Sequence, residues 1–145
     1  MKKISVLAML ALMLVFGLVF VGCGGLDESP ELTQIYVVTR ADWEAGNVSN
    51  PKTTITANVP YMIYYIGKAP YEELTGFRII IKRGSTVVSD YESGFTTSTS
   101  PIRGNFSFVT GSYWLPAGSY TIEVYVVDAN GNKSNTRTVT LTVTQ

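Results

Sequence analysis

Pairs of carboxylates are the first residues in this sequence that could perform chemistry. Asp90 and Glu92 are two positions apart, so their side chains would share one face of a strand. Two carboxylates facing each other across a cleft, roughly 5–9.5 Å apart, could hydrolyse a glycoside. Glu72 and Glu73 are adjacent after Tyr71, and adjacent residues do not share a strand face. We expect a solvent-facing strand edge at the first pair and a solvated loop at the second.

A short acidic and amide-rich segment resembles the start of a calcium-binding loop. Its three alternating residues are Asp128, Asn130 and Asn132. The sixth position of such a loop requires glycine and the twelfth a bidentate glutamate, but this sequence has Lys133 and Val139 there. We therefore expect a hairpin stabilised by Asx side chains, in which Asn130-Gly131 supplies positive φ values. Asp128 remains a weak candidate for a metal contact.

Aromatic side chains are the most suggestive candidates for binding. The sequence contains nine tyrosines and two tryptophans, and aromatic faces pack against sugars and anchor protein interfaces. Tyr64 and Tyr65 are adjacent, so in a strand they point to opposite faces. The candidate ligand-binding residues are Trp43, Tyr64, Tyr71, Tyr91, Tyr113 and Trp114. The same side chains could instead fill a core or cover a sheet edge, and the sequence leaves both interpretations open.

The composition excludes several classes of function. The 145 residues include 11 basic and 11 acidic side chains, no histidine and one cysteine. A neutral chain is a poor partner for nucleic acid. Without histidine there is no histidine triad and no histidine-ligated zinc site, and one cysteine cannot build a disulfide framework. No nucleophile elbow, Walker loop or dinucleotide-binding glycine motif occurs, so we expect a protein that is not an enzyme and needs no cofactor.

The first residues have the layout of a secretory signal peptide. Lys2 and Lys3 precede an apolar run at 4–21, which is the order of a charged segment and a hydrophobic segment in such signals. The run approaches the ~20 residues that span a bilayer, so an uncleaved membrane anchor is an alternative. In both interpretations the rest of the chain lies outside the cytoplasm, because the two lysines stay inside.

The end of this run, Phe20-Val21-Gly22-Cys23, resembles the lipobox of bacterial lipoproteins, although that family most often has leucine where Phe20 stands. The resemblance implies that the signal peptide 1–22 is removed and that Cys23 carries diacylglycerol, with further acylation, for example by palmitate, at the new amino terminus. Two or more acyl chains give stable anchoring. Glycine rather than aspartate after the cysteine implies the outer membrane, if the organism has one.

The remaining chain divides into a tether and one domain. Residues 23–31 are small, polar and interrupted by proline, as expected of a short lipidated tether. From 32–145, apolar and polar residues alternate, as in one-sided strands of antiparallel sheets. The predicted strands are 32–39, 53–59, 61–66, 76–82, 86–91, 102–109, 119–127 and 136–144. Turn signals between them include Gly67–Pro70, which should end the third strand, and the serine- and threonine-rich stretch from Gly94 to Pro101.

The C-terminal segment is similar to the closing hairpin of bacterial immunoglobulin-like and fibronectin type III-like domains. The similarity is carried by Leu115–Tyr120, by the alternating Ile122-Glu123-Val124 and by Asp128–Asn132. It implies an antiparallel immunoglobulin-like β-sandwich of seven or eight strands, in which the Tyr120 hydroxyl bonds back to the upstream backbone. The antibody cysteine pair is absent. Such a fold alone does not specify a function.

Three functional hypotheses follow. The first is a membrane-anchored envelope lipoprotein that acts as a non-catalytic binding or structural module, facing the periplasm or the exterior, with a glycan or an envelope protein as ligand. The second is an accessory domain or weak carboxylate-based hydrolase of the cell envelope, which requires Asp90, Glu92 or Glu72 to converge in a pocket. The third is a protein that pairs through a strand edge, and a long uncovered edge without lysine or proline would favour it.

Overall fold

The computed structural model describes residues 28–48, 51–95 and 102–145. The predicted signal peptide 1–22, Cys23 and most of the stretch from Gly94 to Pro101 lie outside the described residues. Within the described part of the chain, no helix has the length and apolar character needed to cross a bilayer.

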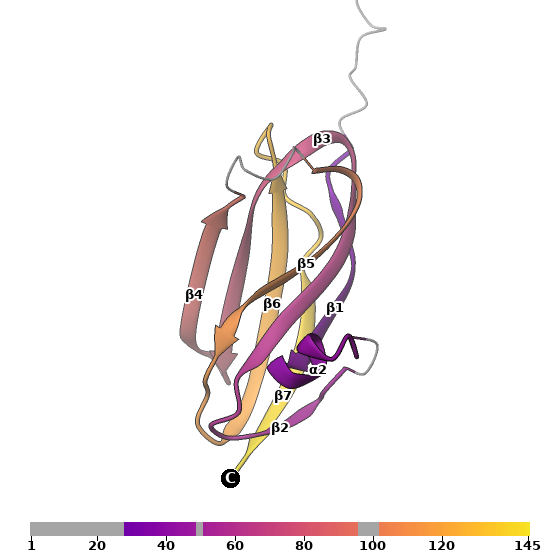
Figure 1. The fold of residues 1–145 in the computed structure, drawn as a ribbon. Helices are drawn as coiled ribbons and strands as arrows, with labels where there is room; N and C mark the ends of the chain where they lie inside the picture. The colour runs from indigo at the N-terminus through magenta and orange to yellow at the C-terminus, as the bar shows by residue number, and fades with distance from the viewer. Residues whose placement is uncertain (1–27, 49–50, 96–101) are drawn as a thin grey trace, which may run out of the picture.

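The described residues form seven strands and one very short helix (Figure 1). The strands are β1 (Glu31–Thr39), β2 (Thr54–Thr56), β3 (Tyr61–Arg83), β4 (Thr86–Gly94), β5 (Ile102–Tyr113), β6 (Gly118–Asp128) and β7 (Arg137–Thr144), and the helix is α2 (Arg40–Glu44). The predicted all-β sandwich is therefore confirmed.

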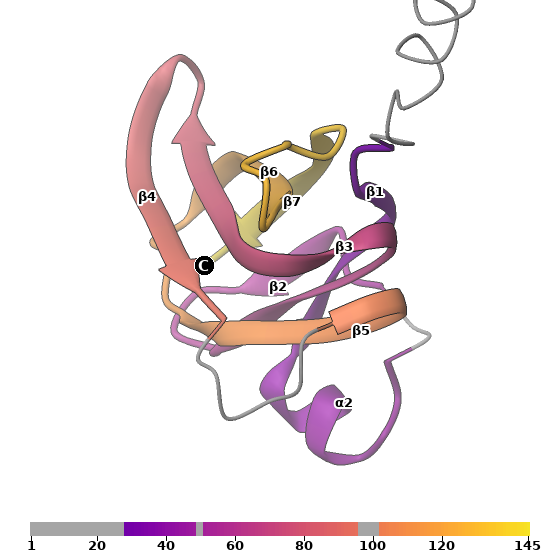
Figure 2. The same ribbon diagram turned by 90° about the horizontal axis from the view of Figure 1, so that it is seen from above.

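Strand β3 belongs to both layers of the sandwich (Figure 2). Its first part pairs antiparallel with β1 and β5, and its last part pairs antiparallel with β4 and β6. Strand β7 continues the second layer beside β6, and β2 lies parallel to β7 at its edge. The bend of β3 between these two parts brings the layers face to face, and the core lies between them.

The continuity of β3 corrects two predictions. Residues 61–66 and 76–82 were expected to be separate strands with a turn at Gly67–Pro70, but one strand runs through both. Gly67 instead allows β3 to lie close to Glu31 and Phe106, because a Cβ there would collide with the Glu31 carbonyl oxygen and the Phe106 ring. Pro70 lies in the stretch 70–73, for which the described ladders give no partner residues, so its missing N–H breaks no ladder bond.

The core follows the alternation seen in the sequence. In β6 every second residue from Tyr120 to Asp128 is buried and the intervening residues are partly exposed. The largest fully buried side chains come from both layers; among them are Tyr61, Ile63, Tyr65, Ile79, Ile81, Ile122, Leu141 and Val37. Full burial of one such aliphatic side chain contributes about 1.5–3 kcal/mol, so this interlayer contact is the main source of stability.

Helix α2 was not expected, since the sequence has no helical periodicity. The helix has only five residues, too few to produce a 3.6-residue pattern. Thr39 caps it: its Oγ1 accepts a hydrogen bond from the Asp42 backbone N–H at 3.1 Å and donates one to Asp42 Oδ2 at 2.7 Å. The Lys52 ammonium lies 3.2 Å from the same carboxylate. These contacts hold α2 against the end of β1 and beside β3.

The β5–β6 connection has the hydrogen bond implied by the tyrosine corner, with the Tyr120 hydroxyl donating to the Pro116 carbonyl at 2.8 Å. The β6–β7 connection, residues 129–136, is longer than a two-residue hairpin, and of the Asn130-Gly131 pair only Gly131 has positive φ. After the turn, the Asn135 side chain accepts from the Leu32 N–H at 2.8 Å and donates to the Leu32 carbonyl at 3.0 Å. This segment therefore covers the start of β1.

Candidate functional site

Three aromatic side chains gather on the outer face of the first layer, and we call them the aromatic platform: Tyr36, Trp43 and Tyr64. Tyr36 on β1 lies directly opposite Tyr64 on β3. Their ring centroids are 6.1 Å apart and the ring planes differ by 16°. The Trp43 ring, carried by α2, lies 5.7 Å from that of Tyr64 at 46°. All three side chains are partly exposed.

Strand alternation and the short helix together position the aromatic platform. The next residue, Tyr65, is fully buried in the core, so Tyr64 points to the opposite, outer face. The Thr39 cap sets the start of α2 and therefore places Trp43 over the same face. At the rim, the Tyr36 hydroxyl donates a hydrogen bond to the exposed Gln34 side chain. The result is an aromatic surface with a polar edge.

The structure brings together two of the six sequence-predicted aromatic residues, Trp43 and Tyr64, and adds Tyr36, which the sequence analysis missed. The alternation of β1 indicates that Tyr36 could face outward, but its position opposite Tyr64 depends on the β1–β3 register. That register is a tertiary property and leaves no signal in either strand alone.

The other candidates lie elsewhere. Tyr91 on β4 is 47% exposed and its ring lies 5.9 Å from that of Phe77. Tyr113 stacks on the core residue Tyr61 with 5.5 Å between ring centroids. Trp114 follows β5 and is 61% exposed. Tyr71 lies within β3, and its side chain is outside the described part of the structure.

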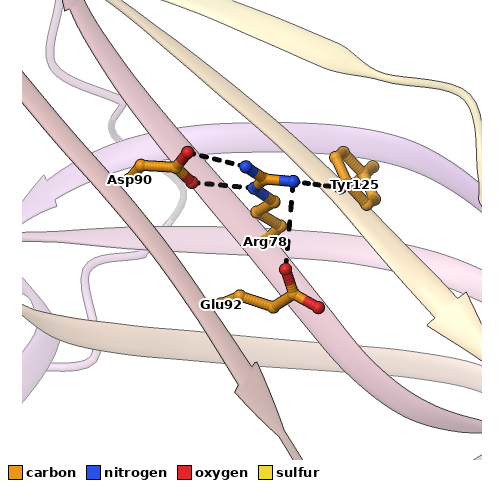
Figure 3. A network of polar contacts seen from close by, with 4 residues as sticks. All are labelled: Arg78, Asp90, Glu92 and Tyr125. Atoms are coloured by element: carbon orange, nitrogen blue, oxygen red, sulfur yellow. Dashed lines mark hydrogen bonds and ion pairs between the residues drawn. The ribbon is translucent and has the colours of Figure 1, made fainter. Parts of the chain in front are cut away.

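Asp90 and Glu92 share the outer face of β4, where both face the Arg78 guanidinium (Figure 3). Arg78 Nε donates to Asp90 Oδ1 at 2.7 Å and Nη2 donates to Oδ2 at 2.6 Å. Its Nη1 donates to the Tyr125 hydroxyl at 3.3 Å and lies 3.9 Å from Glu92 Oε2. The hydrogen bonds from Arg78 hold the pKa of Asp90 below its ordinary value. A general acid needs the opposite shift, so this arrangement does not form an acid/base pair.

The predicted loop at Glu72-Glu73 is wrong, because both residues lie in β3. The Glu73 carbonyl accepts a hydrogen bond from Ala129 N–H at 2.8 Å, which ties the bend of β3 to the β6–β7 turn.

A pocket of about 200 Å³ lies at the end of β4, and Glu92 is the one carboxylate among the described residues that line it. Among its described lining residues, this pocket therefore lacks the second carboxylate that glycoside hydrolysis requires.

The Asp128 carboxylate stabilises the β6–β7 turn through hydrogen bonds. Its Oδ1 accepts from the backbone N–H groups of Asn130 at 3.0 Å and Asn132 at 2.8 Å, and Oδ2 accepts from Asn132 Nδ2 at 3.1 Å. The residue is buried, and both carboxylate oxygens are directed at amide donors. Among the described residues, no three histidine, cysteine, aspartate or glutamate side chains are grouped in a way that could hold a metal ion.

Comparisons with known proteins were made for sequence and for structure. No family model and no curated protein sequence matches the chain. Among solved structures, the chain is similar to the PKD domain of an M14-like peptidase from a Thermoplasmatales archaeon, with a TM-score of 0.43 and 15% sequence identity. The superposition covers 81% of this chain and 98% of that domain.

Proposed function

We propose that this protein is a lipid-anchored, non-catalytic module of the bacterial cell envelope that binds a glycan on the aromatic platform. The observation that carries the proposal is the stacking of Tyr36, Tyr64 and Trp43 on one partly exposed face. Exposed aromatic clusters of this kind are a common property of binding surfaces rather than of cores.

The geometry of the aromatic platform favours a ligand with a flat apolar face. The Tyr36 and Tyr64 ring planes are nearly parallel, at 16°, and the two rings are stacked on each other, so an exposed ring face of this stack could contact the C–H groups of a pyranose ring. The Gln34 amide at the rim supplies donors and acceptors for hydroxyl groups. A sugar combines these two properties, since one face of its ring is apolar and its edges are polar.

The position of the aromatic platform fits an anchor at Cys23. Strand β1 begins at Glu31 at one end of the sandwich and runs toward α2 near the other (Figure 1). Its nine residues span roughly 30 Å at ~3.3 Å per residue. Acyl chains on Cys23 would therefore hold the sandwich by the end remote from Trp43, and the aromatic platform would face away from the membrane.

The proposal is tested by titrating the protein with soluble oligosaccharides of glucose and of N-acetylglucosamine. In a Trp114→Phe background, Trp43 is the single indole and its emission reports on the aromatic platform. We expect saturable emission changes with at least one oligosaccharide, and at least a tenfold loss of affinity in Tyr64→Ala, or roughly 1.4 kcal/mol.

The matched control is Trp114→Ala, which removes an aromatic side chain that is larger than that of Tyr64, is 61% exposed and lies outside the aromatic platform. It should bind with unchanged affinity. Equal affinities of Tyr64→Ala and the unmodified protein, with the same urea midpoint, would contradict the proposal, as would the absence of binding across the panel.

A further inference from the structure

Strand β4 presents an uncovered sheet edge. It pairs with β3 on one side, and Figures 1 and 2 show no strand beyond it on the other side. Among the described residues, no other element hydrogen-bonds to the backbone of Thr86–Gly94. Its nine residues include neither lysine nor proline, the residues that usually protect such edges.

The edges of β1 and β2 are covered or short, whereas β5, among the described residues, also pairs with β3 alone and its twelve residues likewise include neither lysine nor proline. The outer edge of β1 receives the Asn135 amide and the Arg137 guanidinium on the Leu32 backbone, and the Lys52 N–H donates to the Val37 carbonyl at 2.7 Å. Strand β2 has only three residues. The open edge of β4 thus contrasts with the edges of β1 and β2.

Strand β4 also carries exposed apolar side chains. Val87, Val88 and Tyr91 are 50%, 46% and 47% exposed, and they are three of the five large hydrophobic residues that are exposed in the described structure. Of these three, Tyr91 lies in the part of β4 that pairs regularly with β3, and unpaired backbone donors and acceptors at such an edge allow an extended segment to add to the sheet.

A β-bulge limits the part of β4 that can pair regularly. Ile81 lies opposite Ser89, whereas Lys82 lies opposite Val87, so Val88 is the extra residue. A bulge bends the strand and disrupts regular pairing. The regular segment is therefore Ser89–Gly94, in which Asp90 and Glu92 point outward and Tyr91 points to the other face.

The negative charges of Asp90 and Glu92 indicate which kind of strand can pair with this edge. If a second copy of the chain paired antiparallel with itself over the regular segment, Asp90 or Glu92 would lie opposite an acidic residue of the other copy. Like charges directly opposite each other destabilise a strand pair. A strand with lysine or arginine at alternate positions would instead place its cations beside Asp90 and Glu92.

A pocket next to Glu92 fits a long cationic side chain. Gly76 and Gly94 lie opposite each other in the ladder, and both line a space of about 200 Å³ that Thr75 and Val127 also line. The Glu92 side chain is 71% exposed and its nearest cationic atom, on Arg78, is 3.9 Å away. The methylene stem of a lysine or arginine could occupy this space with its charge at the Glu92 carboxylate.

We propose that the Ser89–Gly94 edge of β4 binds an extended segment of a partner protein that carries lysine or arginine at every second position, and that this segment adds to the second layer as a further strand. Backbone hydrogen bonds supply the affinity, and the Glu92 carboxylate with its adjacent pocket supplies the specificity. This site is separate from the aromatic platform and does not depend on it.

The test uses the full chain with two synthetic peptides, one alternating lysine with valine and threonine, the other with glutamate in place of lysine. Binding is followed by fluorescence anisotropy of labelled peptide and by amide hydrogen exchange. We expect the lysine peptide to slow exchange at Ser89–Gly94 and to leave the β1 amides unchanged. Its affinity should fall as salt is raised.

Charge reversal makes the test specific. In Glu92→Lys, the lysine peptide should bind at least tenfold more weakly and the glutamate peptide should bind more tightly. Glu44→Lys makes the same charge change on α2 and should leave both affinities unchanged. The proposal is overturned if both peptides bind equally, if Glu92→Lys has no effect, or if the peptide-free chain dimerises with protected β4 amides.

Discussion

Arg78 on β3 and Asp90 on β4 form a two-point ion pair, with Nε–Oδ1 and Nη2–Oδ2 distances of 2.7 and 2.6 Å. The two residues are diagonal neighbours in the ladder, because Arg78 lies directly opposite Glu92 and Asp90 opposite Ile80. This pair ties the edge strand to the centre of its layer. The same contacts that lower the pKa of Asp90 thus support the fold rather than catalysis.

The pH dependence of stability should reveal this pair. A carboxylate whose pKa is lowered by folding stabilises the protein at pH values above its pKa in the unfolded chain, which is 3.8. This contribution is lost as the pH falls through the pKa of the carboxylate in the folded protein. We expect Asp90→Asn to reduce the loss of stability between about pH 5 and pH 2, measured by urea unfolding. An acid-induced loss equal to that of the unmodified protein would contradict this assignment.

The tyrosine corner should contribute measurably to stability. Tyr120→Phe removes the hydrogen bond to the Pro116 carbonyl while keeping the buried ring, so we expect a loss of about 1 kcal/mol in the free energy of unfolding. Tyr36→Phe is the matched control, since its hydroxyl bonds an exposed glutamine. If both variants unfold at the same urea concentration, the corner has no special role.

Loss of the Tyr61 hydroxyl should not reduce stability, in contrast to loss of the Tyr120 hydroxyl. Its hydroxyl is buried and has no hydrogen-bond partner among the described residues, and burial raises its pKa well above the ordinary value. Since an unsatisfied buried hydroxyl costs about 1–3 kcal/mol, Tyr61→Phe should leave the free energy of unfolding unchanged or increase it. A clear loss of stability in urea unfolding would show that the hydroxyl has a partner.

Gly67 should tolerate no side chain. A Cβ there would meet the Glu31 carbonyl oxygen and the Phe106 ring, so Gly67→Ala should lower the free energy of unfolding by about 1–3 kcal/mol. Gly94→Ala is the comparison, because the nearest atom to its Cβ would be the Thr75 carbonyl oxygen at 3.5 Å. Comparable thermal midpoints for the two variants would refute the close approach of β1 and β3.

The lipid anchor is tested at Cys23, which lies outside the described residues. Since acylation needs the thiol, we expect Cys23→Ser either to release the protein from membranes or to leave its signal peptide uncleaved. Mass spectrometry of the N-terminal peptide and membrane fractionation measure the two outcomes. Normal processing together with normal membrane retention would rule out the acyl anchor.

Much of the secondary structure follows from local sequence. The alternation from Tyr120 to Asp128 matches the observed burial of β6, because a strand with one buried face needs apolar side chains at every second position. The same reasoning located β1 and β7 within one or two residues. The outward position of Tyr64 also follows from alternation, since its neighbour Tyr65 enters the core.

The features that create the candidate sites depend on contacts between distant segments. Gly67–Pro70 has the composition of a turn, yet the pairing of β3 with both layers keeps it extended. The register of β1 against β3 places Tyr36 opposite Tyr64, and the bulge at Val88 leaves Ser89–Gly94 as the regular part of the open edge. Local sequence determines which face of a strand a residue occupies, but only the packing of the two layers determines which residue it meets there, because register and strand neighbours are set by long-range contacts.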